Sequence, residues 1–209
     1  MLDFLFAQYA SYPAYEIVLE LTAIFFGLWS VWAAKNNTLA VFPTGIINTA
    51  IYVYLLWKWH LLGDMLINAY YVVMSVYGWI LWTRKDAQQN ELPITRMQPK
   101  EYLYSGLLFV AAVVFVVLVY LFFGKFTHWT SYVDTGVTGI FFVGMWLMAR
   151  RKIENWLFWI AGDLISIPLY FAKGYTFTSI QYLIFTIIAL YGYIAWKNNL
   201  NSSPAASSK

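Results

Sequence analysis

The feature of this sequence that most restricts its fold is an internal repeat of three apolar segments. Phe25, Gly27, Trp29, Lys35 and Gly45 return 117 residues later as Phe142, Gly144, Trp146, Lys152 and Gly162, and Tyr77, Gly78, Ile80 and Trp82 return 114 residues later as Tyr191, Gly192, Ile194 and Trp196. Each copy contains three long apolar segments, and a seventh apolar segment separates the copies. A duplicated three-helix unit is typical of secondary transporters, in which substrate sites form where the repeats meet.

The composition places these segments in a membrane. With 61% hydrophobic and only 11% charged residues, the chain has too little polar material to cover a soluble domain of 209 residues. A bilayer core about 30 Å thick requires about 20 helical residues, and the chain divides at this length. The predicted spans are residues 17–34, 39–57, 65–82, 102–123, 131–149, 156–172 and 175–196.

We therefore predict an all-α integral membrane protein with seven transmembrane helices in a 3+1+3 arrangement, as in sugar carriers of this type. Residues 17–82 and 131–196 form the two triplets, and residues 102–123 form the linker helix. Because one helix separates the triplets, both enter the membrane in the same direction and are parallel repeats. Residues 83–101 are polar and are predicted to be a cytoplasmic loop. Residues 1–16 are predicted to lie at the membrane interface, and residues 197–209, rich in Asn, Ser and Ala, to form a disordered tail.

The distribution of Lys and Arg predicts the orientation in the inner, cytoplasmic membrane. An amino terminus outside the cell leaves only Lys58, Lys125 and Lys173 outside. The basic residues inside are then Lys35, Arg84, Lys85, Arg96, Lys100, Arg150, Arg151, Lys152, Lys197 and Lys209. Since positive residues are retained on the cytoplasmic side, we predict an outer amino terminus and a cytoplasmic carboxyl terminus.

The sequence excludes several classes of chemistry. The absence of cysteine rules out disulfides, thiolate nucleophiles and cysteine metal sites. His60 and His128 lie beside span ends, where polar interface residues are expected, and a metal site there would need convergent ligands. The scattered basic residues form no stripe for nucleic acid, and no catalytic motif or phosphate-binding glycine loop occurs. We predict no enzymatic activity, no cofactor and no metal.

The most informative polar residue is Asp163 in the sixth span. It follows Trp156 by seven residues, which places it about 10 Å inside the apolar layer. A charged group there costs about 3 kcal/mol, so such residues face a partner or a wet cavity. Trp159 shares its helix face, and Pro168 is predicted to kink the helix nearby. The alternative is that Asp163 is protonated or hydrogen-bonded to a neighbouring helix and only holds the bundle together.

Uncharged polar groups fall at comparable depth in other spans. Asn48, Asn68 and Gln181 lie in the second, third and seventh spans. Each alone is more typical of a hydrogen bond between helices. Together with Asp163, and with the aromatic residues Tyr71, Trp159 and Tyr182, they indicate a pocket that hydrogen-bonds a polar molecule and stacks on its ring.

Three acidic residues open spans at the outer side. Glu16 and Glu20 begin the first span, and Asp134 begins the fifth. Acids at helix starts complement the helix dipole, which is our interpretation of all three. The alternative is a funnel that attracts cations to the outer mouth.

Several separated motifs resemble those of the PnuC vitamin transporters. The sixth-helix signature of that family is similar to residues 154–159 (ENWLFW), 162–167 (GDLISI) and 173–174 (KG). Its second-helix motif resembles residues 45–48 (GIIN), and the end of its third helix resembles residues 77–79 (YGW). The similarity extends over about residues 17 to 197.

This resemblance implies uptake of a B-vitamin-type nucleoside or heterocycle by facilitated diffusion, with a cytoplasmic kinase that traps it by phosphorylation. It also implies a homotrimer. Family members that take nicotinamide riboside use residues that correspond to Asn48, Trp159, Asp163 and Gln181. Asn68 stands where many of these carriers have Gln, and Asp163 stands where Asn is commoner.

The chemistry of the predicted pocket narrows the substrate. Nicotinamide riboside and thiamine are both ring cations, which suit an aromatic wall with one carboxylate through cation–π attraction and charge pairing. Riboflavin is neutral and larger, and uses the carboxylate less well. We predict nicotinamide riboside, with thiamine as the alternative. A hypothesis of a different class is a membrane scaffold, which predicts no saturable binding of a small heterocycle.

Overall fold

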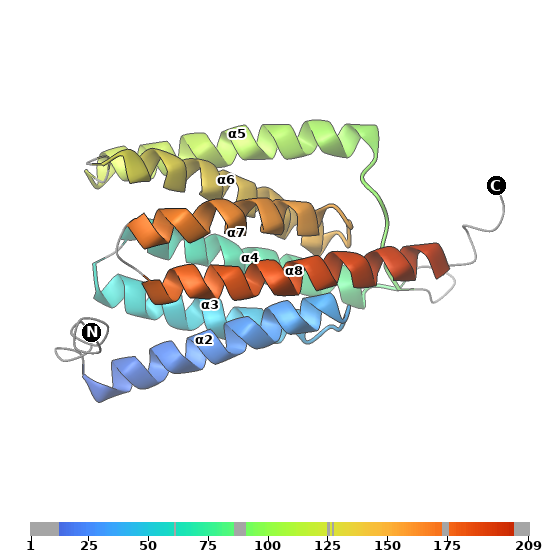
Figure 1. Cartoon of the computed structure of the whole chain (residues 1–209), viewed down its shortest axis with the longest axis horizontal. Helices are drawn as coiled ribbons and strands as arrows, with labels where there is room; N and C mark the ends of the chain where they lie inside the picture. Colours follow the sequence, from blue (N-terminus) through green and yellow to red (C-terminus); the bar gives the residue numbers. More distant parts are fainter. Residues whose placement is uncertain are drawn as a thin grey trace.

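The computed structural model describes residues 13–60, 62–85, 91–124, 126, 128–172 and 176–202. Over this part of the chain there are seven helices: α2 (Ala14–Lys35), α3 (Val41–Lys58), α4 (Leu62–Thr83), α5 (Pro99–Phe122), α6 (Trp129–Ala149), α7 (Asn155–Ala172) and α8 (Thr176–Ser202). All seven run roughly along one axis, with α5 and α2 at opposite edges of the view in Figure 1. The prediction of an all-α bundle of seven helices is confirmed.

The helices have the lengths that a bilayer requires. Five of those described, α2, α4, α5, α6 and α8, are long and apolar enough to cross a membrane. The other two, α3 and α7, have 18 residues each, which corresponds to about 27 Å at about 1.5 Å per residue. Each of these two helices carries a polar residue of the predicted site, Asn48 on α3 and Asp163 on α7.

The two repeats have the same internal order. In each, the second helix lies between the other two: α3 packs against α2 and α4, and α7 packs against α6 and α8. The repeats meet along two seams, α4 against α6 and α2 against α8. The linker helix α5 packs on α6, on the outside of the second repeat. This pairing is the 3+1+3 architecture.

Two tryptophans, which we call the seam tryptophans, close both seams at one end of the bundle. Trp82 Nε1 donates a hydrogen bond to the Ala149 carbonyl oxygen at 3.1 Å, and Trp196 Nε1 donates to the Ala34 carbonyl oxygen at 2.9 Å. Both tryptophans are almost completely buried. The third helix of each repeat is thus fastened to the end of the first helix of the other repeat. We call this end, where the loop from α4 to α5 and the turn from α6 to α7 lie, the basic end.

Two glycines, Gly78 and Gly192, allow the rings that contact the seam tryptophans to pack closely against α4 and α8. A Cβ at Gly78 would overlap the ring of Phe42, and a Cβ at Gly192 would lie 2.6 Å from the Trp156 ring. Phe42 and Trp156 then meet the seam tryptophan of their own repeat edge-on, with centroids 4.9 and 5.6 Å apart. Phe42 and Trp156 are 114 residues apart, which is the spacing that also separates Trp82 from Trp196. The two positions are therefore equivalent in the two repeats, and the edge-on packing is the same although one ring is a phenylalanine and the other a tryptophan.

We expect the Gly192→Ala substitution to destabilise the bundle. The new methyl group would overlap the fully buried Trp156 ring, and overpacking of this kind costs about 1 to 3 kcal/mol. Gly106→Ala is the matched control, because no heavy atom lies within 4 Å of a Cβ at Gly106. Thermal unfolding in detergent should show a lower midpoint for Gly192→Ala and no loss for Gly106→Ala. Equal midpoints would contradict this account of the packing.

The last helix differs from the prediction. α8 continues past the predicted end at Trp196 to Ser202, whose Oγ donates to the Asn198 carbonyl oxygen at 2.9 Å. The first residues of the predicted disordered tail are therefore helical, because a helix anchored by Trp196 can extend beyond the apolar layer. Residues 1–12 and 203–209, which contain most of the predicted interfacial segment and the rest of the tail, lie outside the described residues.

Candidate substrate site

Asp163 lies inside the bundle on α7. The residue is only 3% exposed, so the carboxylate does not face lipid. The ion pairs among the described residues do not include it, and it lies within electrostatic range of the Tyr71 hydroxyl on α4 and the Tyr182 hydroxyl on α8. A buried carboxylate without a counter-ion is costly. This position therefore favours a ligand that is cationic or donates hydrogen bonds.

A row of rings, which we call the aromatic wall, lies beside Asp163 in the second repeat. The Trp159 ring stacks on Phe141 with centroids 5.3 Å apart, and Phe141 is nearly parallel to Tyr182 at 6.2 Å. Tyr170 continues the row, 5.1 Å from Tyr182. Trp159 precedes Asp163 by four residues, so both side chains lie on the same face of α7. The wall combines rings from α6, α7 and α8.

A second aromatic group connects the first repeat to this site. The Tyr70 ring stacks on Phe142 at 3.8 Å, and its hydroxyl donates to the Phe142 carbonyl oxygen at 3.1 Å. Tyr71 meets Phe142 edge-on at 5.9 Å. Phe141 and Phe142 are adjacent on α6 and point in different directions around the helix. One ring therefore joins the aromatic wall while the other contacts α4 across the seam.

Two glycines lie where these rings contact α6 and α7, and the close approach requires glycine at Gly162. A Cβ at Gly162 would overlap the Phe141 ring, and a Cβ at Gly144 would lie 3.4 Å from the Trp159 ring. Gly162 comes directly before Asp163, so the Phe141 ring lies against the α7 backbone one residue before Asp163. α7 continues through Pro168 to Ala172.

The three predicted amide residues have different surroundings. Asn48 Nδ2 donates to the Ala23 carbonyl oxygen at 2.7 Å and joins α3 to α2. Asn68 Nδ2 donates to the Asp64 carbonyl oxygen at 3.0 Å, within α4. Gln181 is half-buried on α8, next to Tyr182 in the sequence. The predicted residues that the structure brings together are Tyr71, Trp159, Asp163 and Tyr182.

The acidic residues at the other end of the bundle are engaged in contacts. Glu16 is buried, forms an ion pair with Lys58 at 2.6 Å and accepts a hydrogen bond from Trp59 Nε1 at 2.8 Å. It therefore joins the start of α2 to the end of α3 and is not free to attract cations. Asp134 accepts a hydrogen bond from the Tyr120 hydroxyl at 3.3 Å.

Several ring residues of the site were not identified from the sequence. These are Tyr70, Phe141, Phe142 and Tyr170. Aromatic residues are common in membrane helices, so their presence alone carries no signal. The internal repeat offered one indication, because Phe142 is the residue that repeats Phe25.

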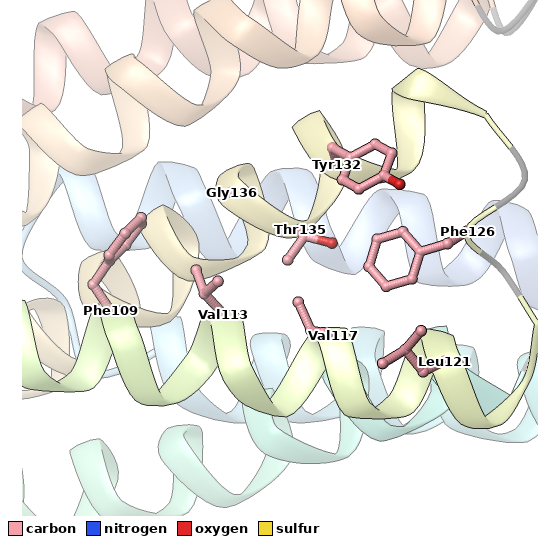
Figure 2. A pocket seen from close by; sticks show the side chains of 8 residues that line it. All are labelled: Phe109, Val113, Val117, Leu121, Phe126, Tyr132, Thr135 and Gly136. Carbon is pink, nitrogen blue, oxygen red and sulfur yellow. The ribbon is translucent and has the colours of Figure 1, made fainter.

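A groove of about 470 Å³ lies elsewhere, between α5 and α6 (Figure 2). Its lining is Phe109, Val113, Val117, Leu121, Phe126, Tyr132, Thr135 and Gly136. In Figure 2, Phe126 and Tyr132 lie together toward one end and Phe109 at the other. The lining contains no charged group and no residue of the aromatic wall. The groove therefore does not suit a polar vitamin.

Comparison with known proteins identifies the family. The family model described as "Nicotinamide mononucleotide transporter" matches residues 17–198, which is most of the chain. The chain belongs to this transporter family. The resemblance to PnuC proteins seen in the sequence motifs is thereby confirmed, and the family is one of transporters and not of enzymes.

Individual relatives carry different names. "Nicotinamide riboside transporter PnuC" of Escherichia coli (strain K12) is 24% identical over 208 residues, which cover 87% of this chain and 85% of that protein. PnuC of Neisseria mucosa is 28% identical over 185 residues, covering 81% and 68%. "Riboflavin/roseoflavin transporter RibM" of Streptomyces davaonensis is 30% identical over 139 residues, covering 66% and 65%. Membership in the family therefore identifies this chain as a vitamin transporter of the PnuC family. The names of its relatives differ in the vitamin that they give.

A solved structure has the same fold. "Crystal structure of the Vitamin B3 transporter PnuC" superposes with a TM-score of 0.66 at 22% identity, covering 96% of this chain and 89% of the other. This chain is therefore a multi-pass membrane protein of the PnuC fold.

Proposed function

We propose that this chain carries nicotinamide riboside across the inner membrane by facilitated diffusion. The observation that carries the proposal is the buried carboxylate of Asp163 beside the aromatic wall. The nicotinamide ring of this nucleoside is a pyridinium cation, which is attracted both by ring faces and by a carboxylate. Tyr71, Trp159, Asp163 and Tyr182 are the proposed contacts. Asn48, Asn68 and Gln181 stay predictions of the sequence.

The two seams suggest how the site opens. The seam tryptophans hold the repeats together at the basic end, which the excess of Lys and Arg assigns to the cytoplasm. Release of substrate to that side requires these two hydrogen bonds to break while the repeats rock around the site. Phosphorylation in the cytoplasm would then trap the vitamin and maintain net uptake without a coupling ion. We further propose a homotrimer on the family resemblance, which mass measurement in detergent tests.

Two other vitamins are candidates. Thiamine is also a ring cation and would use the same carboxylate and rings. Riboflavin is supported by a different observation, the 30% identity to RibM over 139 residues. Its neutral ring system gains little from Asp163, which is why we place it after the cations.

A competition assay tests the substrate. Proteoliposomes that contain the protein should equilibrate labelled nicotinamide riboside with no proton or sodium gradient. An excess of unlabelled nicotinamide riboside should block this uptake, and riboflavin should not. Stronger competition by riboflavin or thiamine would reassign the substrate. The absence of saturable uptake of all three vitamins would favour a scaffold over a transporter.

A further inference from the structure

A second, smaller pocket lies at the basic end of the bundle, with a volume of about 170 Å³. Its walls come from α4, from the loop between α4 and α5, and from the turn between α6 and α7. The lining residues are Tyr77, Leu81, Leu92, Pro93, Thr95, Arg150 and Lys152. The two charged residues of this lining are both cations, so the pocket favours an anion.

The cations of this pocket are only partly neutralised. The Glu101 carboxylate forms ion pairs with both cations, at 3.2 Å from Arg150 Nη2 and at 2.9 Å from Lys152 Nζ. One carboxylate thus faces two positive charges. Arg150 has five N–H donors, its side chain is 39% exposed, and its ion pair with Glu101 uses Nη2. Donors and net positive charge therefore remain for a ligand.

Hydrogen bonds between the α4–α5 loop and the α6–α7 turn hold the backbone around the pocket in place. The Thr95 amide donates to the Arg151 carbonyl oxygen and the Ile153 amide donates to the Thr95 carbonyl oxygen, both at 3.0 Å. The Met97 amide donates to Glu154 Oε2, also at 3.0 Å. The loop that follows α4 is thus fixed to the turn that follows α6, and the pocket is formed before any ligand binds.

An apolar stripe on α4 leads into this pocket. Val73, Val76, Tyr77 and Ile80 are 64%, 44%, 36% and 46% exposed. Their spacing places them on one face of the helix, and Tyr77 at the same time lines the pocket. α4 and α5 scarcely contact each other, so α5 does not cover this face.

We propose that the pocket binds the phosphate headgroup of an anionic phospholipid, with the acyl chains of that lipid along the exposed stripe of α4. Basic pockets between transmembrane helices at the cytoplasmic side bind anionic headgroups. A free anion would use Arg150 and Lys152 but would gain nothing from the apolar stripe. The lipid would bridge α4 of the first repeat and the α6–α7 turn of the second, so its binding stabilises the seam between them.

Thermal unfolding in a neutral detergent tests the proposal without measuring transport. Phosphatidylglycerol should raise the unfolding midpoint, whereas phosphatidylcholine and inorganic phosphate should not. Arg150→Gln removes a cation, and Thr95→Asp adds a negative charge while it leaves the pairs with Glu101 in place. Both variants should lose the shift. Lys100→Gln, an exposed cation at the same end, should keep it.

Three outcomes would overturn the proposal. An equal shift with phosphatidylcholine would show that headgroup charge is irrelevant. An equal shift with inorganic phosphate would assign the pocket to a free anion. Full retention of the phosphatidylglycerol shift in both pocket variants would place the lipid elsewhere. Native mass spectrometry of the unaltered chain gives a second measurement, in which phosphatidylglycerol adducts should survive at energies that remove phosphatidylcholine.

Discussion

The Asp163→Ala substitution is expected to raise the KM for nicotinamide riboside uptake by about 10- to 100-fold in proteoliposomes. The side chain is buried without an ion-pair partner among the described residues, so its electrostatic attraction is available to a bound cation. A hydrogen bond to a charged group contributes about 1.5 to 3 kcal/mol, which corresponds to this range of affinity. Uptake should be measured as initial rates over a range of substrate concentrations.

The same variant separates a binding role from a structural one. If Asp163 only joins helices, Ala should lower the unfolding midpoint and leave the KM of the folded protein unchanged. If Asp163 binds substrate, the midpoint should be equal or higher, because an unpaired buried carboxylate has been removed. Asp163→Asn retains a hydrogen-bonding group without the charge, so its KM should fall between those of the parent and Ala.

The Trp159→Ala substitution should have the second-largest effect, an increase in KM of about 30-fold. The Trp159 ring begins the aromatic wall and stacks on Phe141. Loss of a cation–π contact in a desolvated site costs about 2 kcal/mol, which gives this factor. Trp159→Phe retains an aromatic face and should recover part of the affinity.

Trp79→Ala is the matched control for loss of an indole. Trp79 lies on α4, is 38% exposed, and takes no part in the ring contacts that define the wall. Its removal should leave the KM unchanged. Similar KM values for the Trp159 and Trp79 variants would show that the aromatic wall does not contact the substrate. The family assignment would be unaffected.

Part of the candidate site was predictable because its residues lie on one helix. Trp159 and Asp163 are one turn apart on α7, so their shared face follows from helix geometry alone. The fate of Asn48 was not predictable in this way. Its amide bonds the Ala23 carbonyl oxygen on α2, and which carbonyl it reaches depends on how α2 and α3 pack. The rings of Phe141 and Phe142 were missed for the same reason, since their importance comes from the neighbours they meet.

The sequence by itself determined seven membrane helices, their order and the duplication of the triplet. The physical reason is that a bilayer leaves the backbone polar groups no partner outside the chain, so each apolar segment of sufficient length must be a helix. Only the tertiary structure decided which faces meet: the seam tryptophans on the opposite repeat, the Tyr70 ring on Phe142, and Glu16 paired with Lys58. Apolarity does not distinguish one helix face from another in lipid. The choice among faces depends on close packing and on individual hydrogen bonds between helices.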